Sequence, residues 1–120
     1  MDKRKILIVD DNVDFITVLK TRLEANNYVV SYAYNGDEGI EKAKKESPDA
    51  ILLDVMMPKM DGYTAVRMLK SNDLTRDIPI IILTVKDKME DLFKSEGVAG
   101  YLLKPYATEE LLKKLKEILG

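Results

Sequence analysis

Short, unbroken runs of apolar residues alternate along the chain with longer segments in which apolar residues recur at helical spacing. A short apolar run bounded by turn residues is typical of a strand buried on both faces. The runs that predict strands are Lys5–Asp10, Tyr28–Tyr34, Ile51–Asp54, Ile78–Thr84 and Tyr101–Leu103. The segments that predict helices are 13–25, 38–46, 62–71, 87–95 and 108–119.

Strands that alternate with helices predict a parallel sheet with helices on both of its faces. Because crossover connections between parallel strands are right-handed, the expected fold is α/β, a doubly wound (βα)5 sandwich of three layers. We expect a single domain over residues 1–120, since this length suits one core and no linker interrupts it.

The helix ends carry local signals. Asp11 and Asn12 precede the first helix and either could cap it, and Asp11 taken alone favours the capping role. Thr108 is the expected cap of the last helix, with Glu110 completing a capping box. The residues of the fourth helix expected to point inward are Met89, Leu92 and Phe93.

Composition narrows the classes of function. The net charge of -2 argues against a general nucleic-acid surface. The absence of histidine excludes His-based catalysis and His-ligated metals, and the absence of cysteine excludes disulfides and thiol chemistry. No apolar run approaches the roughly 20 residues of a membrane span, and the run after the basic N-terminus is too short for a signal peptide. We therefore expect a cytoplasmic protein.

Polar residues end four of the predicted strands: Asp10 and Asp11 the first, Asp54 the third, Thr84 the fourth and Lys104 the fifth. The carboxyl ends of parallel strands lie along one edge of the sheet, so these side chains should meet there. Three close carboxylates repel one another and one lysine cannot neutralise them, whereas Mg2+ bound through oxygen ligands would. A carboxylate can also accept a phosphoryl group, which requires the positioning and charge neutralisation that this set offers.

Each of these residues taken alone has a structural explanation. A single strand-end aspartate is most simply a turn or cap residue, and a single lysine is most simply a solvated charge. The coincidence of all five at strand ends favours a functional site. The methionines after Asp54 (Met56, Met57 and Met60) are better explained as loop and core filler than as ligands.

Four segments in order along the chain resemble the receiver domain of two-component response regulators, and the resemblance covers essentially the whole length. Each segment alone is weak, and the four together are specific. The segments are Ile8–Asp11, Leu53–Gly62, Leu83–Thr84 and Tyr101–Pro105. The resemblance implies the flavodoxin-like strand order 2-1-3-4-5 and a single-domain, chemotaxis-regulator-like receiver without an effector domain.

The resemblance also implies roles for the carboxylates. Asp54 would be the phosphoryl acceptor, taking the group from a phosphohistidine on a sensor histidine kinase or a phosphotransfer protein. Asp11 and Asp54 would bind Mg2+ together with the backbone carbonyl of Met56, and Asp10 would act through a metal-bound water. Such a protein is not a conventional enzyme, although it catalyses its own phosphorylation and its own dephosphorylation.

The remaining residues would contact the phosphoryl group or move in response to it. Lys104 would contact its oxygens, the Thr84 hydroxyl would move to bond one of them, and Tyr101 resembles the switch aromatic that turns inward when Thr84 moves. The Lys104–Pro105 peptide bond would be cis. Phosphorylation would bias a two-state equilibrium in the face formed by the fourth helix, fifth strand and fifth helix, which would bind a downstream protein. No direct nucleic-acid or membrane partner is expected.

Three features depart from the common pattern. Val85 stands where the family usually has a small residue, so it could restrict access of small phosphodonors or of water. Met56 and Lys86 occupy variable positions that influence phosphoryl lifetime. The segment from Thr84 to Tyr101 is shorter than the resemblance leads us to expect.

Two other functions stay open. A phosphatase of the haloacid dehalogenase type also uses an aspartate and magnesium, but it expects a second aspartate at the position of Met56 and a cap domain. A phosphate-independent interaction module of the same fold would be expected to lack a residue of the acidic pocket. The sequence fits a free-standing regulator and a receiver cut from a longer protein equally well.

Overall fold

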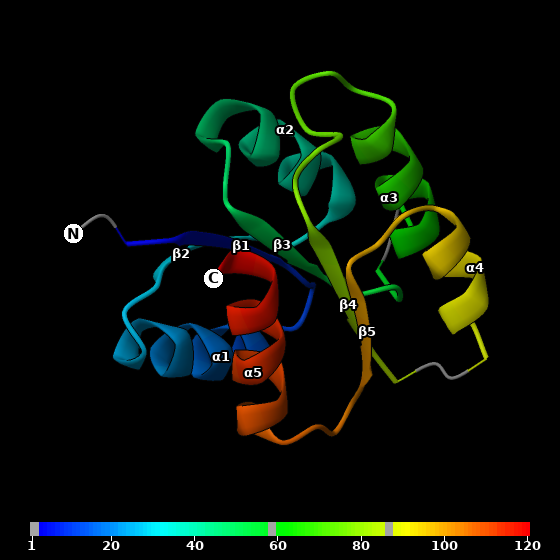
Figure 1. The fold of residues 1–120 in the computed structure, drawn as a ribbon. Coiled ribbons are helices and arrows are strands. Elements are labelled where there is room, and N and C mark those ends of the chain that lie inside the picture. Colours follow the sequence, from blue (N-terminus) through cyan, green and yellow to red (C-terminus); the bar gives the residue numbers. More distant parts are fainter. Residues whose placement is uncertain (1–2, 58–59, 86–87) are drawn as a thin grey trace.

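The computed structural model describes residues 3–57, 60–85 and 88–120. Within these residues, five parallel strands form one sheet in the order β2-β1-β3-β4-β5 (Figure 1). The strands are β1 (Lys5–Val9), β2 (Val29–Ala33), β3 (Ala50–Leu53), β4 (Ile80–Thr84) and β5 (Gly100–Leu103). The doubly wound fold and the strand order 2-1-3-4-5 are therefore confirmed.

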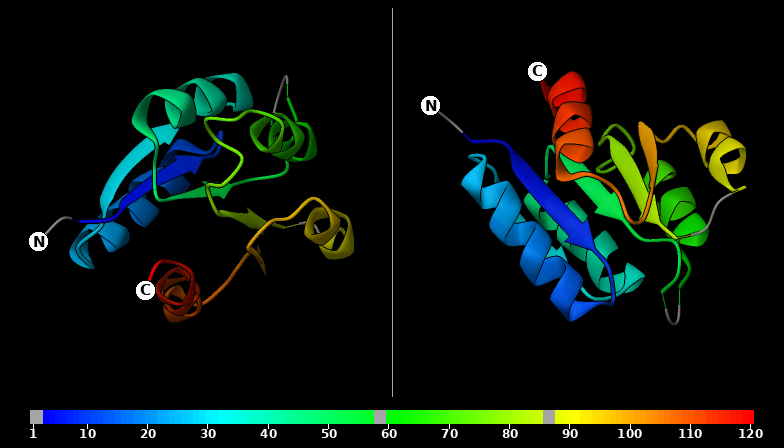
Figure 2. Two further views of the ribbon diagram at one scale, coloured as in Figure 1. Left: turned by 45° about the horizontal axis from the view of Figure 1, so that its top comes forward. Right: turned by 90° about the horizontal axis from the view of Figure 1, so that it is seen from below.

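The helices form the two outer layers. They are α1 (Val13–Ala25), α2 (Gly36–Glu46), α3 (Gly62–Lys70), α4 (Glu90–Ser95) and α5 (Thr108–Leu119). Helices α1 and α5 cover one face of the sheet, and α2, α3 and α4 cover the other (Figure 2). No helix in the described part of the chain is long and apolar enough to cross a membrane.

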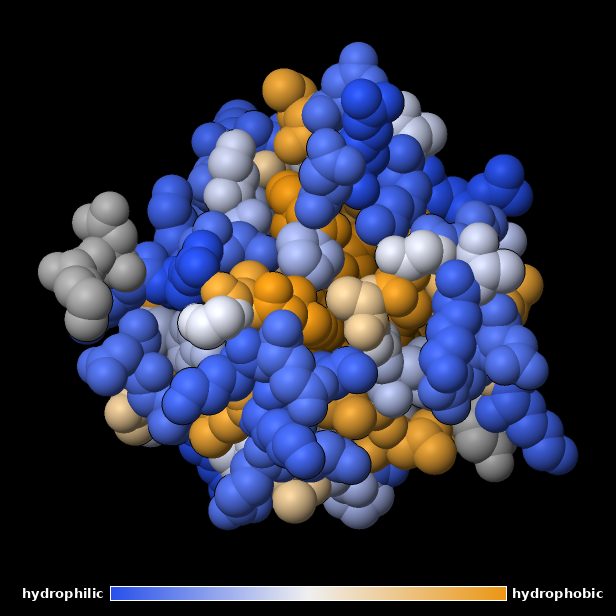
Figure 3. Space-filling view, viewed as in Figure 1, coloured by the Kyte–Doolittle hydropathy of each residue, from blue (hydrophilic) through white to orange (hydrophobic). Residues whose placement is uncertain are grey.

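The core consists of two apolar clusters, one on each face of the sheet. Successive side chains of a strand point to opposite faces, so β1 contributes Leu7 and Val9 to the cluster under α2, α3 and α4, and Ile6 and Ile8 to the cluster under α1 and α5. This double burial explains why the strands are continuous apolar runs. In the view of Figure 3, hydrophilic residues dominate the outline and hydrophobic ones appear mainly toward the middle.

Backbone pairing at the carboxyl edge of the sheet brings the strand-end residues together. The N–H of Asp54 donates to the carbonyl of Val9 at 3.0 Å, which places Asp54 beside Asp10. The N–H of Lys104 donates to the carbonyl of Thr84 at 2.8 Å. The candidate site is therefore assembled by the register of the central strands.

The N-terminal cap of α1 is Asn12, whose side-chain oxygen accepts from the N–H of Phe15 at 3.0 Å. The capping role favoured for Asp11 is wrong, because Asn12 has the extended backbone of a cap residue and occupies the position from which its side chain reaches the free N–H groups. Helix α2 begins at Gly36, two residues before the predicted start.

The predicted cap of α5 is also wrong. Ala107 is the residue with extended backbone before the helix, and no side chain caps its first turn. Thr108 is already helical, and its hydroxyl instead accepts a hydrogen bond of 2.5 Å from Arg22 of α1. A tertiary contact has replaced the local one, and there is no capping box with Glu110.

Helix α4 is shorter than predicted, because it begins at Glu90. Of the residues expected to point inward, Phe93 is fully buried and Met89 packs against the core as the residue before the helix. Leu92 is 43% exposed, so its predicted burial is wrong. Six helical residues make fewer than two turns, which can bury only a narrow stripe.

Candidate functional site

Three aspartates meet at the carboxyl edge of the sheet. Asp10 follows β1, Asp11 begins the loop into α1, and Asp54 follows β3. One oxygen atom from each carboxylate lies within 4.8 Å of the others. Asp10 is 2% exposed and Asp54 is 8% exposed, whereas Asp11 is open to solvent. The site therefore has two sheltered carboxylates and one that faces water.

Lys104 supplies the positive charge at this edge. Its ammonium nitrogen lies 2.9 Å from Oδ2 of Asp10, and its side chain is 18% exposed. The other oxygen of Asp10, Oδ1, accepts from the N–H of Asn12 at 2.9 Å. Lys104 thus neutralises Asp10 in part, and Asp11 and Asp54 keep a surplus of negative charge.

The pKa of the Asp54 carboxyl is raised, and burial is the largest cause. Burial raises the pKa of this carboxyl above 3.8, the Lys104 ammonium lowers it, and the Asp10 carboxylate raises it again. The backbone N–H groups of Met56 and Val55 lower the pKa of Asp54 as well, and the net shift is upward. A carboxylate held charged in this setting favours a nearby cation.

Thr84 and Tyr101 lie on neighbouring strands. Thr84 is fully buried at the end of β4, and Tyr101 in β5 is paired with Ile82. Because side chains alternate along a strand, Thr84, Ile82 and Tyr101 share the face of the sheet that α4 covers. The Tyr101 ring packs on Phe93 with centroids 5.9 Å apart. Tyr101 therefore shares a face of the sheet with Thr84 and packs against α4.

The loop after Asp54 is held close to the site. The N–H of Met56 lies 3.4 Å from Oδ1 of Asp54, and the Met56 side chain is exposed rather than core filler. Met57 is buried and Met60 packs against the core. Val85 is 65% exposed. The predictions for Lys86, and for Pro58 and Lys59 in the resemblance, fall outside the described residues.

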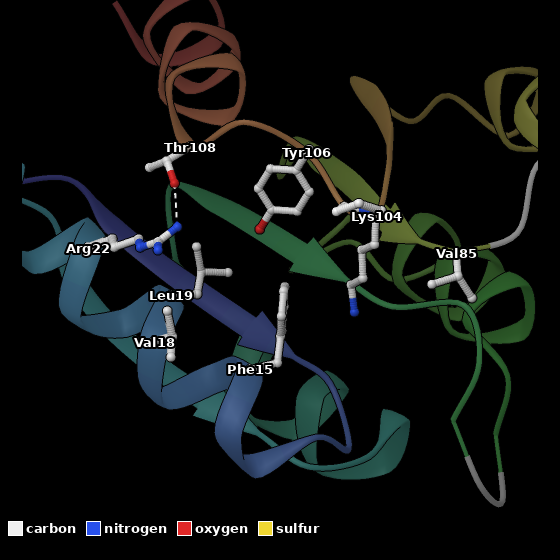
Figure 4. A pocket seen from close by; sticks show the side chains of 9 residues that line it. Phe15, Val18, Leu19, Arg22, Val85, Lys104, Tyr106 and Thr108 are labelled. Atoms are coloured by element: carbon white, nitrogen blue, oxygen red, sulfur yellow. Dashed lines mark hydrogen bonds between the residues drawn. The ribbon is translucent and has the colours of Figure 1, made fainter.

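An apolar pocket of about 390 Å³ opens beside Lys104, between α1 and the segment that joins β5 to α5 (Figure 4). Arg22 and Thr108 lie at one end, Val85 lies at the other, and Phe15 and Lys104 lie between them. The Lys104–Pro105 peptide bond, which the resemblance implies to be cis, is cis in this wall. Sequence reasoning missed Phe15 at this edge. The available signal was an aromatic residue in the first turn after the paired aspartates.

Tyr106 in this pocket provides a pH test. Burial, foremost, raises the pKa of Tyr106 to about 12, with Arg22 lowering it and Asp10 raising it. The unfolded chain loses this proton near pH 10, so between about pH 10 and 12 stability falls as pH rises. We expect Tyr106→Phe to lose less stability than the unaltered chain over this window, in urea unfolding followed by circular dichroism. Equal losses would contradict the assignment.

The family model of the response regulator receiver domain matches residues 6–116. Protein PilH of Pseudomonas aeruginosa is 39% identical over 118 residues, which cover 97% of this chain and 98% of PilH. The alkaline phosphatase synthesis transcriptional regulatory protein PhoP of Bacillus subtilis is 40% identical over 118 residues, but this chain spans only 48% of its length.

A solved structure has the same architecture. The receiver domain of the sensor histidine kinase PA1611 from Pseudomonas aeruginosa, described with a magnesium ion coordinated in its active site cleft, has a TM-score of 0.88 and 30% identity, covering 99% of this chain and 100% of that one. The sequence match, the sheet order and the three clustered carboxylates agree with one another. This chain belongs to the receiver domains of two-component response regulators.

Proposed function

We propose that Asp54 of this receiver is the phosphoryl acceptor and that its donor is a phosphohistidine on a sensor histidine kinase or a phosphotransfer protein. The arrangement of charge around Asp54 supports this proposal above all else. Its sheltered carboxylate has two further carboxylates within 4.8 Å and the Asp10-bound ammonium of Lys104 in the same cluster. A cluster of two sheltered carboxylates and one exposed carboxylate with a single lysine is poorly balanced by itself, and it suits a reaction that brings a cation and a phosphoryl group.

The residues present fit magnesium. Their donors are hard carboxylate oxygens, and no histidine or cysteine exists in the chain to favour a softer metal. Asp11 and Asp54 would hold the ion with the backbone carbonyl of Met56, and Asp10 would act through a bound water. When bound, magnesium supplies neutralisation of the charge on the transferred phosphoryl oxygens.

The transfer itself needs little covalent chemistry from the protein. A carboxylate oxygen of Asp54 forms the bond to phosphorus while the bond from phosphorus to the donor nitrogen breaks, and that nitrogen keeps the electron pair. Lys104 would place its ammonium against the phosphoryl oxygens. The site thereby binds and orients the group instead of activating a water nucleophile.

The added phosphate would then act as a switch. It brings about two negative charges to the edge where Thr84 ends β4. We propose that the Thr84 hydroxyl bonds a phosphoryl oxygen and that Tyr101, on the same face, follows it inward. The packing of Tyr101 on Phe93 supports a path from the site to α4. The face of α4, β5 and α5 would then bind a downstream protein.

Two alternatives are not favoured. A phosphatase of the haloacid dehalogenase type needs an acid two residues after its nucleophile, where this chain has Met56, whose thioether carries no proton to donate. An interaction module that never binds phosphate would not need the sheltered carboxylates and lysine that the structure holds together. Cytoplasmic location and a single-domain organisation stay predictions.

Removal of metal tests the proposal. We expect the chain incubated with acetyl phosphate and magnesium to gain one phosphoryl group by intact mass, and the same chain with excess EDTA to gain none. Because exposed Val85 could hinder small donors, a phosphorylated phosphotransfer domain serves as a second donor. No gain of mass from either donor, together with no beryllofluoride binding, would reject the proposal.

A further inference from the structure

The Lys104 ammonium has two close partners. One is Oδ2 of Asp10 at 2.9 Å, and the second is the ring of Phe15, whose centroid is 3.8 Å from the nitrogen. This distance is well inside the range of about 6 Å over which an ammonium is attracted to an aromatic face. In the described part of the chain, Asp10 is the only carboxylate within salt-bridge distance of Lys104.

The Phe15 ring is itself connected to Asp10 through a closed loop of contacts. Oδ1 of Asp10 accepts from the N–H of Asn12 at 2.9 Å, and Oδ1 of Asn12 accepts from the N–H of Phe15 at 3.0 Å. The ring of Phe15 and Oδ2 of Asp10 then meet at the ammonium of Lys104. The first turn of α1 is thus fixed by the same aspartate that pairs with the lysine.

The two partners of Lys104 differ in chemistry. Asp10 accepts a hydrogen bond from the Lys104 ammonium. It therefore competes with any phosphoryl oxygen for the three N–H groups of that ammonium. The Phe15 ring attracts the positive charge through its electron-rich face and offers no oxygen ligand. It can therefore hold the ammonium at the site while the N–H groups exchange one oxygen partner for another.

We propose that Phe15 is a positioning residue for phosphoryl transfer, which holds the Lys104 ammonium at the phosphoryl site through its aromatic face. This inference rests on the proposed function, because it assigns Lys104 to the phosphoryl oxygens. It also explains why a large aromatic ring is only partly buried in the pocket wall of Figure 4, next to the lysine.

A purely structural Phe15 would only pack against its apolar neighbours, and leucine would replace it. The test therefore compares variants of the full chain that keep an apolar side chain at position 15 but remove or weaken the electron-rich aromatic face. Phe15→Leu removes the ring, whereas site-specific 3,5-difluorophenylalanine at position 15 weakens the negative face and keeps the shape. The matched control is Val18→Ala, which alters the same wall of the pocket one turn further along α1.

The first measurement does not depend on phosphorylation. In the proton spectrum of lysine-labelled protein, the ε-methylene of Lys104 should be shifted upfield by the ring current of Phe15. We expect this shift to disappear in Phe15→Leu and to persist in Val18→Ala. An unchanged Lys104 signal in Phe15→Leu would overturn the contact and the proposal with it.

The second measurement is the rate constant of phosphorylation at saturating phosphodonor. We expect a fall of about three- to tenfold in Phe15→Leu, a smaller fall with difluorophenylalanine, and a change of less than about twofold in Val18→Ala. Equal rates in the unaltered chain and Phe15→Leu would overturn the proposal. If the unaltered chain takes no phosphoryl group, the proposed function fails, and the role of Phe15 in transfer fails with it. The ring-current shift still tests the contact between Phe15 and Lys104 in that case.

Discussion

Asp54→Asn is expected to take no phosphoryl group from acetyl phosphate or from a phosphorylated partner protein. The neutral amide is a far weaker nucleophile than the carboxylate. Asp10 is already paired with Lys104, and Asp11 is open to solvent. Intact mass after incubation measures the result. Asp73→Asn, which changes an exposed aspartate outside the cluster, should be phosphorylated like the unaltered chain.

Although Asp54→Asn should abolish phosphorylation, we expect it to raise the stability of the metal-free protein. The pKa of Asp54 is raised in the folded chain, so folding becomes less favourable as pH rises from about 4 through the raised value. Metal-free Asp54→Asn lacks this loss, and we expect its melting temperature at pH 7 to exceed that of the unaltered chain by a few degrees. At pH 3, where the carboxyl is protonated in both states, the difference should shrink.

Two results would contradict this account of Asp54. Phosphorylation of Asp54→Asn at the unaltered rate would place the acceptor elsewhere. A lower melting temperature of the metal-free variant at pH 7 would show that the carboxylate is stabilised by its surroundings, in conflict with the direction of its pKa.

Gly62→Ala is expected to destabilise the fold by about 3 kcal/mol and to slow phosphorylation. A methyl group on Gly62 would lie 2.6 Å from Cα of Val55 and 2.7 Å from the carbonyl oxygen of Asp54. Both are backbone atoms, and the N–H of Gly62 also donates to the carbonyl of Val55 at 2.8 Å. The loop must therefore move, and the acceptor moves with it. Urea unfolding followed by circular dichroism measures the loss.

Gly36→Ala is the matched control, since both glycines are the first residue of a helix after an Asn or Asp cap. The nearest atom to a methyl group on Gly36 is the sulfur of Met60 at 2.9 Å, which belongs to a flexible side chain that can turn away. We expect a cost below about 1 kcal/mol, offset in part by the better helix propensity of alanine. Equal losses in the two variants would show that the close approach at Gly62 is unimportant.

Sequence patterns predicted the long elements of this protein better than their ends. The span of α1 is as predicted, because Ile16, Leu19 and Leu23 repeat at helical spacing and are all buried. The predicted cap of α5 was wrong, because the Thr108 hydroxyl accepts a hydrogen bond from Arg22, which lies in a helix distant in the sequence. The predicted burial of Leu92 was wrong, because α4 is too short to bury a second stripe of side chains. Local signals therefore fail where a tertiary contact offers a group a competing partner, and where an element is shorter than its pattern predicts.

The periodicity of the sequence was enough to predict the order of strands and helices along the chain and to place Asp10, Asp54, Thr84 and Lys104 at one edge of the sheet. Periodicity is a local property, and all parallel strands end at the same edge of a sheet. No local pattern predicted that Lys104 would choose Asp10 as its partner and lie on the Phe15 ring. That choice depends on strand register and on how α1 is rotated against β5, which are set by packing of the whole core.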